Sequence, residues 1–113
     1  MEISFQNRKL ERMASDDQWC LKALGKIRAK IFLRRLSDLK FARNLEDVRF
    51  LPGHYHELVG DRKGEWACDL DQPYRMVFVP HENPIPTDDK GRFVWVEIKG
   101  IEIIEIIDYH SKH

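Results

Sequence analysis

The chain has 113 residues, with 19 Lys/Arg balanced by 19 Asp/Glu and a formal net charge of zero. A chain of this length can bury a core without disulfides, so we expect a single domain over residues 1–113. It has no 18-residue apolar run and no signal-peptide pattern, so we expect a cytoplasmic protein with no membrane partner. Cys20 and Cys68 lie in apolar patterns, which indicates buried thiols rather than a disulfide or a metal pair.

The charge is unevenly distributed along the chain. Residues 1–50 hold 12 Lys/Arg and 7 Asp/Glu, a net charge of +5, whereas residues 51–113 hold 7 and 12, a net charge of −5. The positive half either faces a phosphate backbone or an acidic partner, or simply provides solvated helix faces, because Lys and Arg are good helix formers. Overall neutrality argues against a protein that binds nucleic acid by bulk charge alone.

The N-terminal half begins with alternation and then becomes helical. Residues 1–5 alternate between polar and apolar, which predicts a short strand, and Asn7 is placed to cap a helix that ends near Ala14. From Trp19 to about Ala42, apolar residues recur at steps of three and four, which predicts a long helix. Gly25 interrupts this pattern and indicates a kink.

The C-terminal half changes to a period of two, after a connector over residues 44–53. The alternation and turn residues predict strands at 54–59, 65–71, 74–79 and about 93–108, turns at 60–64 and 72–73, and a surface loop at 81–92. Within the last strand, Gly100 and the adjacent pair Ile103-Ile104 break strict alternation and indicate a bulge or a junction.

The order of elements is one strand, two helices, and a meander of three or four strands. This order predicts an α+β fold of two layers, in which the N-terminal strand and helices pack on one face of a mainly antiparallel sheet. The opposite face is expected to be open and concave. Polar side chains from alternate positions of the strands would converge on it.

Arg75 is a candidate for that open face. It shares a strand face with Val77 and Val79, and burying an unpaired guanidinium in a core is costly. The alternative is a structural salt bridge to Asp69 or Asp71.

Two histidines and a basic turn lie upstream of Arg75. His54 and His56 are two residues apart and should share a strand face. They are solvated strand residues, catalytic or RNA-contacting groups, or metal ligands, but no third ligand follows at a diagnostic spacing and we predict no metal site. Arg62 and Lys63 lie in a glycine-flanked turn and either grip phosphates or are exposed charges without a partner.

An acid, a phenol and an imidazole follow the isoleucine-rich segment at residues 101–107. These groups, Asp108, Tyr109 and His110, would sit on a stiff strand, which suits acid/base chemistry because a rigid support fixes their geometry. The alternative for His110 is an exposed residue in a frayed end.

Three segments, taken in order, resemble the HigB group of RelE/ParE-type toxins. They are HELVGDRKGEW at residues 56–66, YRMVF at residues 74–78, and DYH at residues 108–110. The resemblance covers essentially the whole chain and implies the RelE-like form of the α+β fold. It also implies a ribosome-associated endoribonuclease, a toxin that is inhibited by a helix-turn-helix antitoxin encoded beside it.

The resemblance implies cleavage of messenger RNA without a metal or another cofactor. Such cleavage requires a deprotonated 2′-hydroxyl, a stabilised phosphorane and a protonated 5′-oxygen. Arg75 would stabilise the phosphorane, and His56 and His110 would exchange the protons. Tyr109 would orient or stack on a nucleotide, and Asp108 would orient a histidine. His54, Arg62 and Lys63 are expected to contact the RNA.

The chain departs from the family pattern at one position. Many family members carry a lysine two or three residues after the histidine that corresponds to His56, where this chain has Val59. Lys63 or Arg62 would have to supply the missing cation. Because ParE-like relatives share the fold but inhibit DNA gyrase by contact, the alternative function is a non-enzymatic binding protein, either a gyrase inhibitor or a degenerate toxin that binds an antitoxin.

Overall fold

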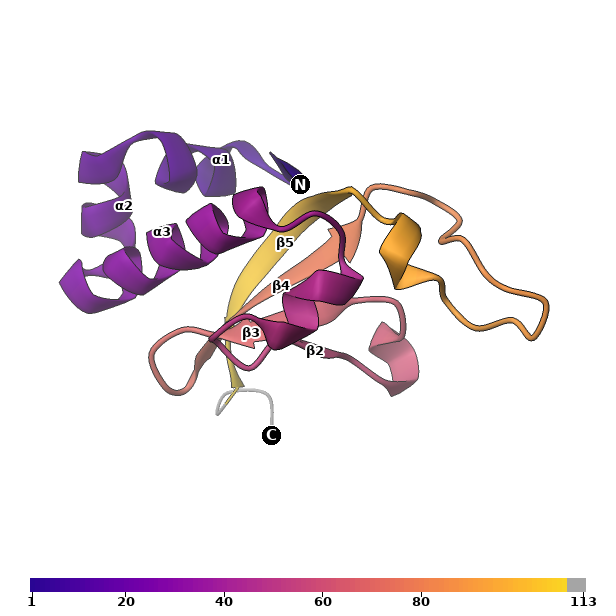
Figure 1. The fold of residues 1–113 in the computed structure, drawn as a ribbon. Helices are drawn as coiled ribbons and strands as arrows, with labels where there is room; N and C mark the ends of the chain where they lie inside the picture. Colours follow the sequence, from indigo (N-terminus) through magenta and orange to yellow (C-terminus); the bar gives the residue numbers. More distant parts are fainter. Residues whose placement is uncertain (110–113) are drawn as a thin grey trace.

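The computed structural model describes residues 1–109 and shows three helices on one side of a five-stranded sheet (Figure 1). The helices are α1 (Arg8–Ser15), α2 (Asp17–Leu24) and α3 (Lys26–Phe41). The strands are β1 (Glu2–Phe5), β2 (His56–Glu57), β3 (Trp66–Asp69), β4 (Tyr74–Pro80) and β5 (Gly100–Asp108). Short 3₁₀ helices occupy Glu46–Phe50 (η1), Gly60–Arg62 (η2) and Trp95–Glu97 (η3). The predicted two-layer α+β fold is confirmed, except that the N-terminal strand does not pack on a face of the sheet with the helices but joins the sheet as its edge strand, in parallel with β5.

The strands lie in the order β1-β5-β4-β3-β2. Only the β1–β5 pair is parallel among these strands, so the sheet is mainly antiparallel as predicted. The register between β4 and β5 shifts where Val77 faces Glu105 but Phe78 faces Ile103. Ile104 is therefore the extra residue, and of the two alternatives expected from the broken alternation, a bulge or a junction, the structure shows a bulge at this position.

The prediction of one long helix from Trp19 to Ala42 is wrong. Gly25 has φ 82° and ψ 164°, a backbone conformation that side-chain-bearing residues rarely adopt. Its N–H donates to the carbonyl of Leu21 and ends α2, while its own carbonyl accepts from Ala29 and starts α3. The glycine therefore separates two helices rather than kinking one, and residues 1–109 contain three α-helices where two were expected.

Two of the predicted strands are shorter than expected. The segment 54–59 pairs only at His56–Glu57, because His54 has φ 55° and the chain enters η2 after Val59. The last strand begins at Gly100 rather than near residue 93. Trp95 lies in η3 instead, where its ring packs edge-on against Trp66 with centroids 5.5 Å apart.

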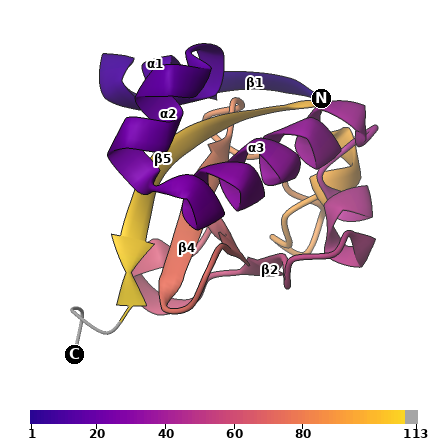
Figure 2. The same cartoon turned by 90° about the vertical axis from the view of Figure 1, so that its left-hand side faces the viewer.

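The main core lies between the helices and the sheet, and α3 crosses that face of the sheet (Figure 2). Buried side chains from α3 meet side chains from the strands at Phe32, Leu36, Leu39, Trp66, Met76, Phe78, Ile101 and Ile103. Cys20 and Cys68 are buried and unpaired, as predicted. Burial raises the pKa of the Cys68 thiol to about 12.

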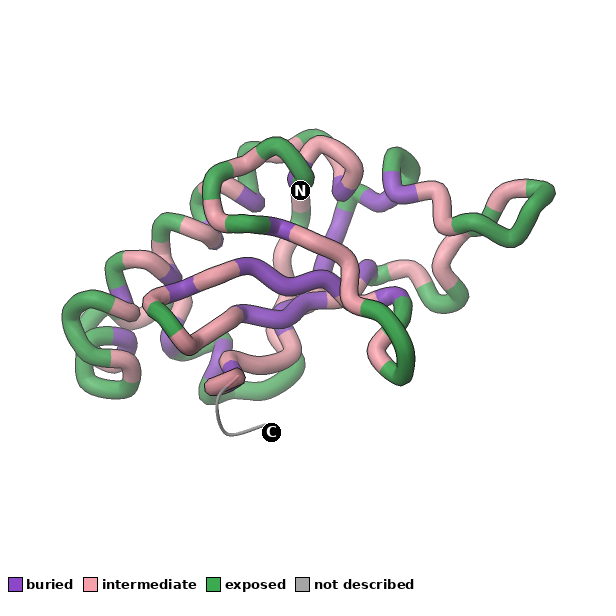
Figure 3. The backbone as a smooth tube through the Cα atoms, turned by 90° about the horizontal axis from the view of Figure 1, so that it is seen from below, coloured by how far each residue is buried: buried purple, intermediate pink, exposed green. Residues whose placement is uncertain are grey.

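The other face of the sheet is not covered by any of the α-helices described within residues 1–109. Its apolar cluster is small and consists of Ala67, Val77 and Ile107, with Leu58, Ile104 and Tyr109 packed against it. Figure 3 shows buried backbone along the middle of the sheet and exposed backbone at the helix surfaces and in the loop at 81–92. None of the helices within residues 1–109 is long and apolar enough to cross a membrane.

Candidate active site

Arg75 projects from the helix-free face of β4 and lies beside Asp69 of β3. The two residues are directly paired in the antiparallel register, and Arg75 Nε lies 3.2 Å from Asp69 Oδ1. Both interpretations from the sequence are therefore realised, since the guanidinium is on the open face and also forms an ion pair.

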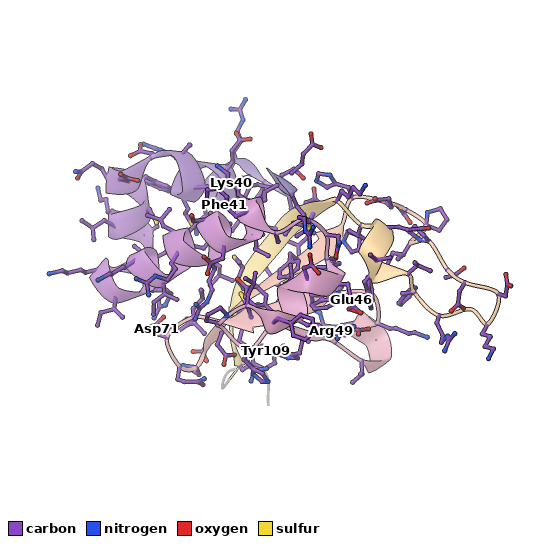
Figure 4. All side chains as sticks on the ribbon, in the orientation of Figure 1. Lys40, Phe41, Glu46, Arg49, Asp71 and Tyr109 are labelled. Atoms are coloured by element: carbon purple, nitrogen blue, oxygen red, sulfur yellow. The ribbon has the colours of Figure 1, made fainter. Side chains whose placement is uncertain are left out.

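Tyr109 lies next to Arg75 because β5 ends where β4 begins. Asp108 pairs with Tyr74, and the N–H of Tyr109 donates to the carbonyl of Pro73 at 3.2 Å. The Arg75 guanidinium carbon is 4.1 Å from the centroid of the Tyr109 ring, a cation–π contact. Figure 4 shows Tyr109 below the sheet, with Lys40 and Phe41 of α3 on the opposite side.

His54 and His56 lie side by side at the same site. Their rings stack with centroids 4.5 Å apart, so the expected common side is observed, although a left-handed turn at His54 produces it rather than a continuous strand. His54 Nδ1 is 3.5 Å from Asp69 Oδ2. His56 Nδ1 is 2.8 Å from the carbonyl oxygen of His54, and since a carbonyl only accepts, His56 Nδ1 carries the hydrogen.

Asp69 joins these groups and was not among the site residues expected from the sequence. Its side chain is 22% exposed and contacts both Arg75 and His54. Its Oδ1 is inaccessible to solvent and has an ion pair but no hydrogen bond. The strand alternation that placed Arg75 on the open face also placed Asp69 there. This alternation in the sequence indicates a possible salt bridge between Asp69 and Arg75, but it does not indicate the contact between Asp69 and His54.

Arg62 and Lys63 differ in the contacts that their side chains make within the protein. Arg62 donates to Glu65 Oε1 at 2.6 Å and also pairs with Glu105. Burial lowers the pKa of Arg62, but its hydrogen bonds to Glu105 and Glu65 outweigh this effect and the pKa is raised. Lys63 Nζ lies 5.5 Å from the ring centroid of Phe93. Lys63 is therefore the better placed of the two to meet a phosphate.

Of the remaining residues that the sequence pointed to, Asp108 and Val59 are described by the structure and His110 is not. Asp108 lies at the end of β5, in register with Tyr74. His110 lies outside the described residues, and its predicted role stays a prediction. Val59, at the position where a lysine was expected from the resemblance, is 85% exposed.

A toxin of known structure is similar. It is the YoeB/ParE toxin from Agrobacterium tumefaciens, with a TM-score of 0.45 and 14% sequence identity over 94% of this chain and 95% of that chain. No protein-family model matches the sequence, and no curated protein matches it.

The site brings together side chains that could bind an anionic ligand and exchange protons with it. Arg75 supplies a permanent cation, Tyr109 supplies a ring surface, and Asp69 links Arg75 to the stacked pair of imidazoles. Asp69 partly neutralises this cation, so binding of a phosphate would compete with an existing ion pair. Within residues 1–109 no group of three or more His, Cys, Asp or Glu side chains is arranged to hold a metal ion.

Proposed function

We propose that the chain is a RelE/ParE-type toxin of the HigB kind, a cytoplasmic endoribonuclease that cuts messenger RNA on the ribosome. The observation that carries this proposal is the position of Arg75, which stacks on Tyr109 and lies beside the carboxylate that contacts His54. These side chains come from four separate segments. Two of those segments carry the motifs that resemble the toxin group.

Each group has a task in metal-free cleavage of a phosphodiester. An imidazole accepts the proton of the 2′-hydroxyl, and O2′ attacks the adjacent phosphorus. The Nη groups of Arg75 stabilise the charge on the phosphorane, and Tyr109 stacks on a neighbouring base. The bond from phosphorus to O5′ then breaks, and O5′ takes a proton from an acid, a role we propose for His110. The products carry a 2′,3′-cyclic phosphate and a 5′-hydroxyl.

Expression of the chain in growing bacteria, followed by mapping of transcript 5′ ends, tests this function. We expect new 5′-hydroxyl ends within translated regions, and their loss in an Arg75→Ala variant. Growth arrest with intact transcripts would contradict the proposal.

We also propose a helix-turn-helix antitoxin as the partner. Lys26, Lys30 and Arg34 are exposed at four-residue steps along α3, so they form a cationic stripe. A groove of about 390 Å³ lies between β1, α1 and α3 and includes Ile3, Phe5 and Leu33 in its lining. An amphipathic, acidic antitoxin segment suits both features. Co-expression with an adjacent gene should yield a complex that is weakened by charge reversal along the stripe.

Two observations favour a binding protein as the second candidate. Asp69 already pairs with Arg75, and Val59 presents an exposed apolar side chain where the toxin group often has a lysine. This candidate would inhibit DNA gyrase by contact. A supercoiling assay separates the two functions, because inhibition that survives both Arg75→Ala and His56→Ala would favour the binding protein.

A further inference from the structure

We infer that Asp69 is a positioning residue of the proposed ribonuclease site, and that His54, which it orients, accepts the proton of the 2′-hydroxyl. This inference rests on the proposed function. It moves the proton acceptor two residues upstream of His56, the position that the resemblance implies.

The backbone of Asp69 is held on both sides of the residue. Its N–H donates to the carbonyl of Gly53 at 2.8 Å. Its own carbonyl accepts from Arg35 Nε of α3 at 2.9 Å. The carboxylate therefore extends from an anchored point at the end of β3, and rotation of its own side chain is its main remaining freedom.

Each oxygen of the carboxylate contacts a different group. Oδ1 lies 3.2 Å from Arg75 Nε, and Oδ2 lies 3.5 Å from His54 Nδ1. A carboxylate next to Nδ1 favours the tautomer with its hydrogen on Nδ1, which leaves the Nε2 lone pair of His54 available to accept a proton. The contact of Oδ1 with Arg75 Nε orients the guanidinium, so the same carboxylate positions both the cation and the imidazole.

The backbone at His54 is the second observation. Within residues 1–109, His54 is the single non-glycine residue with a positive φ, at 55°. A left-handed conformation is unfavourable for a side-chain-bearing residue, and such outliers cluster at functional sites. Gly53 precedes it with φ 126°, so the turn brings the imidazole toward Asp69. The stacked ring of His56 covers one side of this imidazole.

The proton balance follows from this geometry. His54 Nε2 takes the proton from the 2′-hydroxyl as the bond from O2′ to phosphorus forms. The resulting imidazolium faces the Asp69 carboxylate, which stabilises the new charge. The bond from phosphorus to O5′ breaks, and O5′ takes its proton from a second acid, for which His110 is the proposed donor. His54 then returns its proton to water.

Single-turnover cleavage of a ribosome-bound message tests the inference, with RNA binding measured in parallel. For Asp69→Asn we expect the rate to fall about 100-fold, with binding unchanged or tighter because a negative charge is lost. His54→Ala should show a similar loss and partial rescue by added imidazole. The matched control is Asp71→Asn, since Asp71 pairs with Arg28 and not with the site, and its rate should stay near that of the wild type.

A second measurement does not depend on catalysis. Nitrogen-15 spectra of the imidazole of His54 should show the Nδ1–H tautomer in the neutral free protein, and a shift toward Nε2–H in Asp69→Asn. The inference would be overturned if Asp69→Asn or His54→Ala cleaved RNA as fast as the wild type does. It would also be overturned if the imidazole of His54 in the wild type were the Nε2–H tautomer. A wild type that cleaves nothing would refute the proposed function, and the spectra would still decide the orientation of His54.

Discussion

The guanidinium carbon of Arg28 lies 3.4 Å from the centroid of the Tyr74 ring. The same guanidinium donates to both carboxylate oxygens of Asp71, at 2.9 and 3.2 Å. Tyr74 and Asp71 flank the turn between β3 and β4, so this contact joins α3 to the hairpin that carries the candidate site.

Arg28→Ala should destabilise the protein by about 2 kcal/mol, because it removes a partly buried cation–π contact together with a two-point ion pair. Urea unfolding measures the change. Arg43→Ala is the control, since the Arg43 side chain is 89% exposed and its ion pair with Asp47 should contribute less than about 1 kcal/mol. Equal losses in the two variants would show that the Arg28 contact has no special weight.

Arg75→Ala should lower the single-turnover cleavage rate by about 10²–10³, because one well-placed donor to a transition-state charge is lost. The affinity for RNA should change much less. Arg92→Ala is a suitable control, since Arg92 is 71% exposed in the loop and pairs with Asp88. If both variants lose the same small amount of activity, Arg75 is structural and the binding function gains support.

Lys63→Ala should mainly affect RNA binding, whereas Arg62→Ala should mainly affect stability. Lys63→Ala should weaken RNA binding and make its salt dependence shallower, with a nearly unchanged rate at saturation. Arg62→Ala should instead reduce stability, because it leaves Glu65 and Glu105 without their shared cation. Filter binding across salt concentrations and thermal unfolding separate the two results. A stable Arg62→Ala protein with weak RNA binding would contradict this division.

His54→Gly should increase stability by about 1 kcal/mol over His54→Ala, because glycine adopts a positive φ without the steric cost of a Cβ. Both variants should lose cleavage activity to the same extent. Chemical denaturation together with the cleavage assay provides the comparison. Equal stability of the two variants would mean that the left-handed turn is not maintained in solution.

Stability should decrease as the pH rises above 9 because of Cys68. Burial raises the pKa of this thiol from 9.0 to about 12, so the unfolded chain releases the proton at a lower pH than the folded protein. The stabilising contribution is complete below pH 9 and is lost between about pH 9 and 12. The stability difference between the wild type and Cys68→Ala, measured in urea from pH 7 to 10.5, should therefore shrink. A constant difference would show that the thiol is not protected by burial.

The sequence predicted the elements that local patterns specify. The apolar pattern around Cys68 correctly indicated a buried thiol, and the broken alternation at Ile103-Ile104 correctly marked an irregularity of the last strand. Contacts between segments that are distant in the sequence could not be predicted from these local patterns. Trp95 lies in a 3₁₀ helix because its ring packs against Trp66, and no local pattern indicates that partner.

The same distinction applies to the candidate site. Strand alternation was sufficient to place Arg75 on the open face, because its consequences are local. The role of Asp69 depends on the register between β3 and β4 and on the left-handed backbone of His54. Both are properties of the folded chain. Arg62 was likewise expected to face a phosphate, whereas its two carboxylate partners come from β5 and from just before β3.

The parallel pairing of β1 with β5 also imposes an order on biosynthesis. Ile3 is translated early, yet its partner Ile101 is among the last residues of the sheet to leave the ribosomal tunnel. Until then β1 has no partner strand in the sheet, and one edge of β4 is open. Tyr109 has not yet reached its position beside Arg75. A nascent chain in which residues 100–109 have not yet left the tunnel thus cannot hold the complete site. An antitoxin would have this interval of translation in which to reach the emerging α3.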